Sequence, residues 1–119
     1  MNTRPEELRE RTKQFAIRVI RLFRALPRTE EARVIGRQLL RAATSVAANY
    51  RAVCRARSRA EFTAKMGIVL EEADETLFWL DLLAAAGIVK KVRLCSLMEE
   101  AEELVRIFHS SIQTARRKS

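Results

Sequence analysis

The stretch QLLRAATSVAANYRAVCRARSRAEF, from Gln38 to Phe62, decides the fold class of this chain. It holds five arginines and a run of small residues, and it contains neither glycine nor proline. At about 100° per residue, its apolar side chains fall on one side of a helix. The whole chain of 119 residues has Gly 3 and Pro 2, too few for a turn-rich β protein. The sequence therefore predicts one all-α domain spanning residues 1–119.

The N-terminal half contains start and stop signals for two helices, expected at about residues 5–26 and 29–57. Pro5 suits the first turn of a helix, with Thr3 as a cap, and Pro27 cannot continue that helix. Thr29 is followed by two glutamates, which is typical of an N-cap and an acidic first turn. The break between the two helices is therefore expected at residues 27–28.

The C-terminal half predicts two further helices, at about residues 59–87 and 92–115. Ser58 followed by Glu61 is a capping box, and Gly87 is a natural C-terminal glycine. Ser96 and Glu99 repeat the capping pattern near the start of the last helix. Short connections favour neighbours that run in opposite directions, so we expect an antiparallel up-and-down four-helix bundle. It would leave a frayed basic tail with Arg116, Arg117 and Lys118.

Arginines occupy the face of the second helix opposite its apolar side. Residues 27–57 carry seven basic and two acidic side chains, whereas residues 58–89 carry two basic and six acidic ones. The acidic third helix could neutralise these arginines within the chain or across a subunit boundary. The face consists of Arg33, Arg37, Arg51 and Arg55, with Arg41 at its margin.

The second and third helices also carry residues that fit a contact between subunits. Phe78, Trp79 and Leu82 point away from the expected core stripe of the third helix. Exposed aromatic and aliphatic clusters of this kind usually mark an interface. Ser45 and Asn49 are polar residues one turn apart on a helix of small residues, and we expect them to hydrogen-bond across a helix contact. The sequence therefore predicts self-association.

Catalysis is the function class that the sequence supports least. The single histidine, His109, has no nucleophile and orienting group with which to form a catalytic set. Glu71, Glu72 and Glu75 lack the Glu-x-x-His motif of carboxylate metal sites in helical bundles. We therefore expect no enzyme activity, no cofactor, no metal and no small-molecule substrate.

The location of the protein is predicted from its apolar runs and its cysteines. No apolar run approaches the roughly 20 residues that cross a bilayer, so no membrane partner is expected. The charged N-terminus lacks the apolar segment of a secretory signal, which favours the cytoplasm. Cys54 and Cys95 fit neither a metal site nor a redox pair, and we expect both to be buried apolar residues.

The segment from Gln38 to Leu83 resembles the bacterial four-helix-bundle proteins encoded in intervening sequences of 23S rRNA genes, and the resemblance covers nearly the whole chain. Arg51 departs from the family pattern, in which an acidic residue is common at this point. The resemblance implies a ring-like homopentamer, a shape shared by the similar accessory variability protein of diversity-generating retroelements, which works with a reverse transcriptase and RNA. The matching positions are Gln38-Leu39, Ala43-Thr44-Ser45, Ala48-Asn49, Ser58 to Phe62 and Glu72 to Thr76.

Two hypotheses for function follow. The first is a structural or protein-interaction adaptor whose arginines meet acidic helices of its own or of a partner. The second is an accessory protein that binds RNA, or an RNA-associated protein, and it is supported by a formal net charge of +8. Against direct RNA binding, the only tyrosine, Tyr50, lies on the core face, so stacking platforms for bases are missing. The RNA-binding candidates are Arg33, Arg37, Arg41, Arg51, Arg55, Arg116, Arg117 and Lys118.

Overall fold

The computed structural model describes residues 5–118. This range contains four α-helices and no strand. Thr3, the predicted cap of the first helix, lies outside the described residues. The helices are α1 (Pro5–Ala25), α2 (Glu30–Val53), α3 (Arg59–Ala85) and α4 (Lys91–Arg117).

Local capping signals begin α2 and α3 and end α3, as the sequence predicted. The Thr29 hydroxyl accepts a hydrogen bond from the Ala32 N–H at 3.3 Å. The Ser58 hydroxyl accepts one from the Glu61 N–H at 3.0 Å. Gly87 follows α3 with a φ of 72°, a left-handed conformation that suits glycine because it has no Cβ.

The end of α2 differs from the expected range of 29–57, because the helix stops at Val53. The N–H of Arg55 donates to the carbonyl of Ala52, and that of Ala56 donates to Val53. These bonds span three residues and tighten the last turn, after which Ser58 takes an extended conformation as the cap of α3. The residues predicted to form the last turn of the second helix therefore form the connection between α2 and α3 instead.

The limits of α4 also differ from the expected ones. The helix begins at Lys91, so Ser96 lies within it and does not cap it. The Ser96 hydroxyl instead accepts a hydrogen bond of 2.7 Å from the Arg18 guanidinium of α1. At the other end α4 continues to Arg117, so the expectation of a frayed tail is wrong for Arg116 and Arg117.

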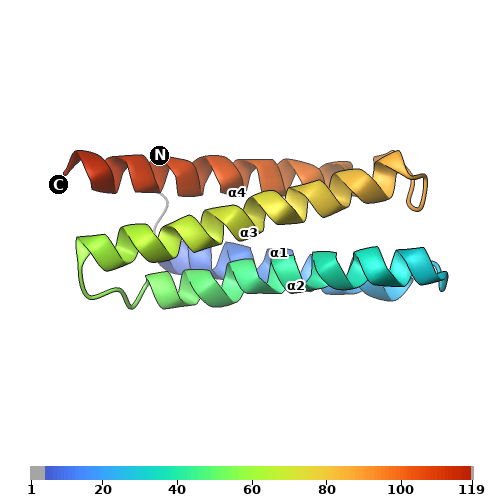
Figure 1. Ribbon diagram of the computed structural model, residues 1–119, viewed down its shortest axis with the longest axis horizontal. Coiled ribbons are helices and arrows are strands. Elements are labelled where there is room, and N and C mark those ends of the chain that lie inside the picture. Colours follow the sequence, from blue (N-terminus) through green and yellow to red (C-terminus); the bar gives the residue numbers. More distant parts are fainter. Residues whose placement is uncertain (1–4, 119) are drawn as a thin grey trace.

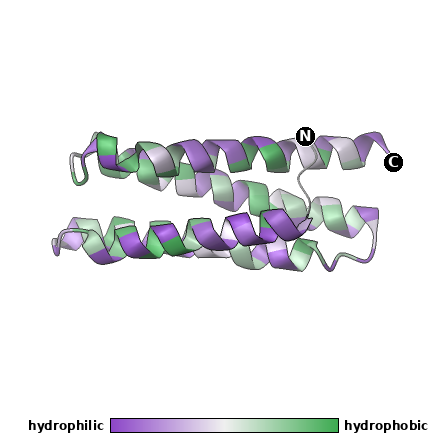
Figure 2. Ribbon diagram, turned by 180° about the vertical axis from the view of Figure 1, so that it is seen from behind, coloured by the Kyte–Doolittle hydropathy of each residue, from purple (hydrophilic) through white to green (hydrophobic). Residues whose placement is uncertain are grey.

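The helices lie lengthwise in an elongated body of 48 × 21 × 19 Å. The α1–α2 and α3–α4 connections lie at one end of this body, and the α2–α3 connection lies at the other (Figure 1). Helix α3 packs extensively against both α2 and α4, and α2 also packs against α1. Hydrophobic and hydrophilic bands alternate along the helices (Figure 2).

A single core runs through the bundle and is filled by large apolar side chains. Tyr50 of α2 stacks on Phe108 of α4, with ring centroids 5.9 Å apart and planes inclined by 25°. Phe15, Leu39 and Met66 bring α1, α2 and α3 into the same cluster. Because every helix contributes to this cluster, its burial is the main source of stability of the bundle.

Few backbone contacts join α1 to α4, and charged side chains connect the two helices. The Arg11 guanidinium donates to both carboxylate oxygens of Glu100, at 2.8 and 3.0 Å. A second carboxylate, that of Glu103, lies 3.3 Å from the same guanidinium. Two parallel charge-assisted hydrogen bonds fix the relative orientation of the groups that they join.

The cysteines differ from the prediction that both are buried. Cys54 is half-buried at the end of α2, and Cys95 is exposed on α4, where its thiol donates to the Lys91 carbonyl at 3.3 Å. Cys95 lies on the outer side of α4 because the adjacent Leu94 and the nearby Leu97 take the core positions. Within residues 5–118, no helix is long and apolar enough to cross a membrane.

Candidate interaction surfaces

The predicted arginine face is present on α2 except for Arg55, which lies in the turn after the helix, and its members differ in their partners. Arg41 donates to Glu72 at 3.2 Å and also bonds Glu75, both on α3. The other four members, Arg33, Arg37, Arg51 and Arg55, are exposed and form no salt bridge within residues 5–118. Internal compensation by the acidic helix is therefore confirmed for Arg41 alone.

Glu75 links this ion pair to the single tryptophan. The indole Nε1 of Trp79 donates to the Glu75 carboxylate at 3.0 Å. This hydrogen bond and the one from Arg41 lower the pKa of Glu75, because both favour the ionised carboxylate. Trp79 is half-buried and packs against the core, so much of its ring contacts residues of its own chain. Less of the Trp79 ring is therefore exposed to a partner than the sequence predicted.

A basic groove lies between the C-terminal half of α2 and the start of α3. Ala48 and Ala52 of α2 line it, and their small side chains leave room between the longer basic ones. The only acidic residue among those that line it, Glu61, lies 3.9 Å from Lys65 on the next turn. We call this surface the arginine groove; its remaining lining residues are Arg51, Arg55, Arg57 and Lys65.

Apolar residues occur all round α3, including the side that faces away from the bundle. Phe78 is 54% exposed and Ile68 is 47% exposed on this side. A Cβ added at Gly67 would meet nothing within 4 Å, so the backbone is open to close approach there. A helix that is apolar on every side is normally covered on every side. In the single chain the outer side of α3 lacks such a cover.

Phe78 borders a shallow hollow between α3 and α4 that is lined by apolar and acidic side chains. Leu77 and Met98 line it beside the Phe78 ring, which is 54% exposed. Three carboxylates also line it, and none of them forms a salt bridge within the described part of the chain. We call this surface the Phe78 patch; it comprises Asp74, Leu77, Phe78, Asp81, Met98 and Glu102.

The remaining interface candidates are half-buried. Leu82 lies on the outer side of α3, one turn after Phe78. The Asn49 side chain donates to the Ser45 carbonyl of its own helix at 2.9 Å. A hydrogen bond from Ser45 or Asn49 across a helix contact stays a prediction. Sequence reasoning missed Ile68, although its position on the outer side of α3 follows from the helical period.

The three basic residues at the C-terminal end lie apart from most of the arginine face. Arg116 and Arg117 are exposed in the last turn of α4, and Lys118 caps it. The Lys118 carbonyl accepts a hydrogen bond from the Arg59 guanidinium of α3. These residues lie at the end of the molecule that holds the α2–α3 connection (Figure 1). They are therefore at the same end as the arginine groove.

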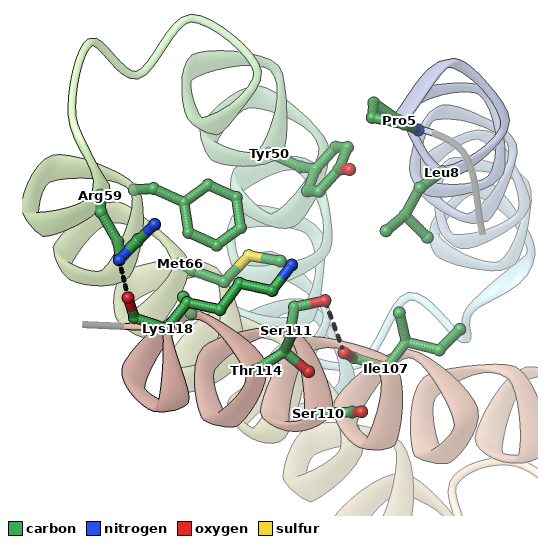
Figure 3. Close-up of a pocket in the computed structure, with 12 residues that line it drawn as sticks. Pro5, Leu8, Tyr50, Arg59, Met66, Ile107, Ser110, Ser111, Thr114 and Lys118 are labelled. Carbon is green, nitrogen blue, oxygen red and sulfur yellow. Dashed lines mark hydrogen bonds between the residues drawn. The ribbon is translucent and has the colours of Figure 1, made fainter. Parts of the chain in front are cut away.

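A cavity of about 490 Å³ opens at this end, lined by residues from all four helices (Figure 3). Its walls include the apolar side chains of Leu8, Met66 and Ile107, and Ser111 donates to the Ile107 carbonyl at 3.0 Å. Burial raises the pKa of Tyr50, because the ionised phenolate is disfavoured away from water. The described lining contains no histidine, carboxylate or cysteine, so it offers no acid–base pair.

The groups that could support catalysis or metal binding are dispersed. His109 is exposed on α4 and does not line the cavity. Glu72 and Glu75 bond Arg41, while Glu71 is exposed. Across residues 5–118, histidine, cysteine and carboxylate side chains form no group of three that could hold a metal ion.

Comparisons with known proteins place this geometry in a family. The family model for the 23S rRNA-intervening sequence protein matches residues 6–110. A crystal structure of a protein of unknown function from the S23 ribosomal protein family, from Bacteroides thetaiotaomicron, is similar with a TM-score of 0.81 and 33% identity. The match covers 87% of this chain and 96% of that one. No curated protein matches the chain. The chain therefore belongs to the 23S rRNA-intervening sequence protein family.

Proposed function

We propose that this protein is a non-enzymatic, homo-oligomeric adaptor of the cytoplasm, built from antiparallel up-and-down bundles. The observation that carries this proposal is the apolar outer side of α3, with Phe78 and Ile68 about half exposed. Burying such side chains against another copy removes apolar area from water and stabilises the assembly. A ring of five subunits is the assembly that the family resemblance implies.

The proposal predicts that charging the outer side of α3 separates the subunits. The double variant Ile68→Glu/Phe78→Glu is expected to give a native mass of one chain, 13.7 kDa, where the parent gives a multiple of it. Each glutamate removes apolar burial from the interface and must lose its water to enter it, which is strongly unfavourable. Native mass spectrometry of the two proteins at the same concentration measures the difference.

The matched control is Val34→Glu/Val92→Glu. These valines are 49% and 78% exposed on α2 and α4, away from the outer side of α3. The control adds the same charge and is expected to keep the parent mass. Circular dichroism checks that both variants keep their helices. An Ile68→Glu/Phe78→Glu protein that assembles like the parent would contradict the proposal.

RNA binding is the second candidate function, and the observation that favours it is the set of unpaired arginines on α2 and in the turn after it. Three exposed guanidinium groups along α2, with that of Arg55 in the turn, offer phosphate contacts without first breaking an internal salt bridge. The tail residues Arg116, Arg117 and Lys118 would add contacts at the end nearest the arginine groove. The resemblance to the retroelement accessory protein supports the same hypothesis by analogy alone.

If RNA is the partner, the arginine face determines the salt dependence of binding. Replacing Arg33, Arg37, Arg51 and Arg55 with glutamine is expected to flatten the slope of log affinity against log salt, by up to about 0.9 per contact for a duplex. Anisotropy of a labelled structured RNA at about 50 and 200 mM salt measures this slope. An unchanged slope, or no binding by the parent at the lower salt, would reject this face as an RNA site.

A further inference from the structure

The two surfaces described above carry unpaired charges of opposite sign. Arg51 and Arg55 border the arginine groove, and Asp74 and Asp81 border the Phe78 patch. All four side chains are exposed and form no salt bridge within residues 5–118. The bundle therefore presents a cationic groove lined in part by two alanines and an acidic hollow bordered by an exposed aromatic ring.

We infer that the Phe78 patch of one copy docks into the arginine groove of a second copy. This inference rests on the proposed self-association and names the two surfaces that meet. Ala48 and Ala52 leave space for the Phe78 ring, and the flanking guanidinium groups can lie over its face. Ile68, three residues after Lys65, continues the groove along α3 with an exposed apolar side chain.

The positions of the charges suit this contact. Asp74 and Asp81 are seven residues apart on α3, which is about 10 Å along the helix, and Phe78 lies between them. Arg51 lies in the last turn of α2, and Arg55 lies in the turn that follows the helix. Both are long side chains, so their guanidinium groups can reach toward the two carboxylates.

The contact joins two different surfaces, so it is heterologous. After two copies have met, one still presents a free Phe78 patch and the other a free arginine groove. The same contact can therefore repeat from copy to copy, and it ends only when the assembly closes as a ring. This property separates the inference from a two-fold dimer, in which one surface would meet its own copy.

Charge reversal with restoration tests the pairing. Arg51→Glu/Arg55→Glu and Asp74→Arg/Asp81→Arg are each expected to raise the dissociation constant of the assembly by at least about tenfold, because like charges then face each other. The quadruple variant exchanges the signs of both surfaces, restores the pairing and returns the net charge to that of the parent. Its dissociation constant is expected to return to within about threefold of the parent value. Sedimentation velocity over a dilution series at low salt measures these constants.

The matched control is Arg33→Glu/Arg37→Glu, which changes the net charge equally on the same helix but outside the groove. It is expected to keep the parent assembly. Arg51→Gln/Arg55→Gln provides a milder change that is expected to weaken assembly in the same direction. Circular dichroism establishes that each protein is folded before its assembly is measured.

The outcomes separate this inference from the proposed function. The inference is supported if both charge reversals weaken assembly and the quadruple variant restores it. Unchanged assembly in the reversals, while Ile68→Glu/Phe78→Glu is monomeric, overturns the inference and leaves the adaptor proposal standing. The inference is also overturned if the quadruple variant does not recover the parent assembly. The same holds if the charge reversals abolish RNA binding without changing assembly. A parent protein that is monomeric at every concentration overturns both.

Discussion

Replacing Phe108 with alanine is expected to lower the free energy of unfolding by about 3 to 5 kcal/mol. The Phe108 ring is fully buried and stacks on Tyr50 with centroids 5.9 Å apart. Its removal loses apolar burial and leaves a cavity, because the surrounding helices can relax only in part. Domains of this kind have a total stability of about 5 to 15 kcal/mol, so the change is a large fraction of it.

Urea unfolding followed by circular dichroism measures this loss at a fixed protein concentration, since self-association makes stability depend on concentration. The control is His109→Ala, which truncates the exposed neighbour of Phe108 and is expected to change stability by no more than about 0.5 kcal/mol. A loss below about 1 kcal/mol for Phe108→Ala would show that this ring is not at the centre of a packed core.

Gly36→Leu is expected to lower the free energy of unfolding by about 1 to 3 kcal/mol. A Cβ at Gly36 would already lie 2.6 Å from Leu26 Cδ1 and 3.2 Å from Phe23 Cδ1. Leu26 can move to admit one methyl group, but a whole leucine side chain must push the end of α1 away from α2. The expected result follows from overpacking at a close helix contact.

Gly67→Leu provides the opposite case on α3. Nothing lies within 4 Å of a Cβ at this position, so the substitution gains helix propensity of up to about 1 kcal/mol without a clash in the subunit. Both substitutions are measured by urea unfolding in the Ile68→Glu/Phe78→Glu background, where only the folding of single subunits contributes. Equal stabilities for the two leucine variants would contradict the helix contact at Gly36.

The sequence predicted those features of the fold that depend on neighbouring residues. Thr29, Ser58 and Gly87 act at helix ends through their own side chain or backbone freedom, so they can be recognised without knowing the rest of the fold. The end of α2 could not be recognised in this way. Arg55 is a good helix former, and the turn there depends on where α3 must begin.

The candidate surfaces were predictable in composition but only partly in their contacts. The helical period placed the arginines on one face, yet only the fold shows that Arg41 meets Glu72 while Arg51 remains unpaired. Trp79 lies off the core stripe by the same period, but its large ring reaches back to the core and to Glu75. Long and large side chains cross the boundaries that a helical wheel assigns to them.

We propose that another copy of this chain covers the outer side of α3. The most direct test is the native mass of the unmodified protein, treated with nuclease and diluted over a wide concentration range. A discrete multiple of the 13.7 kDa chain is expected at the upper concentrations, with no accompanying nucleic acid required. A mass of 13.7 kDa throughout would contradict it, because Phe78 and Ile68 would then be exposed in the functional protein.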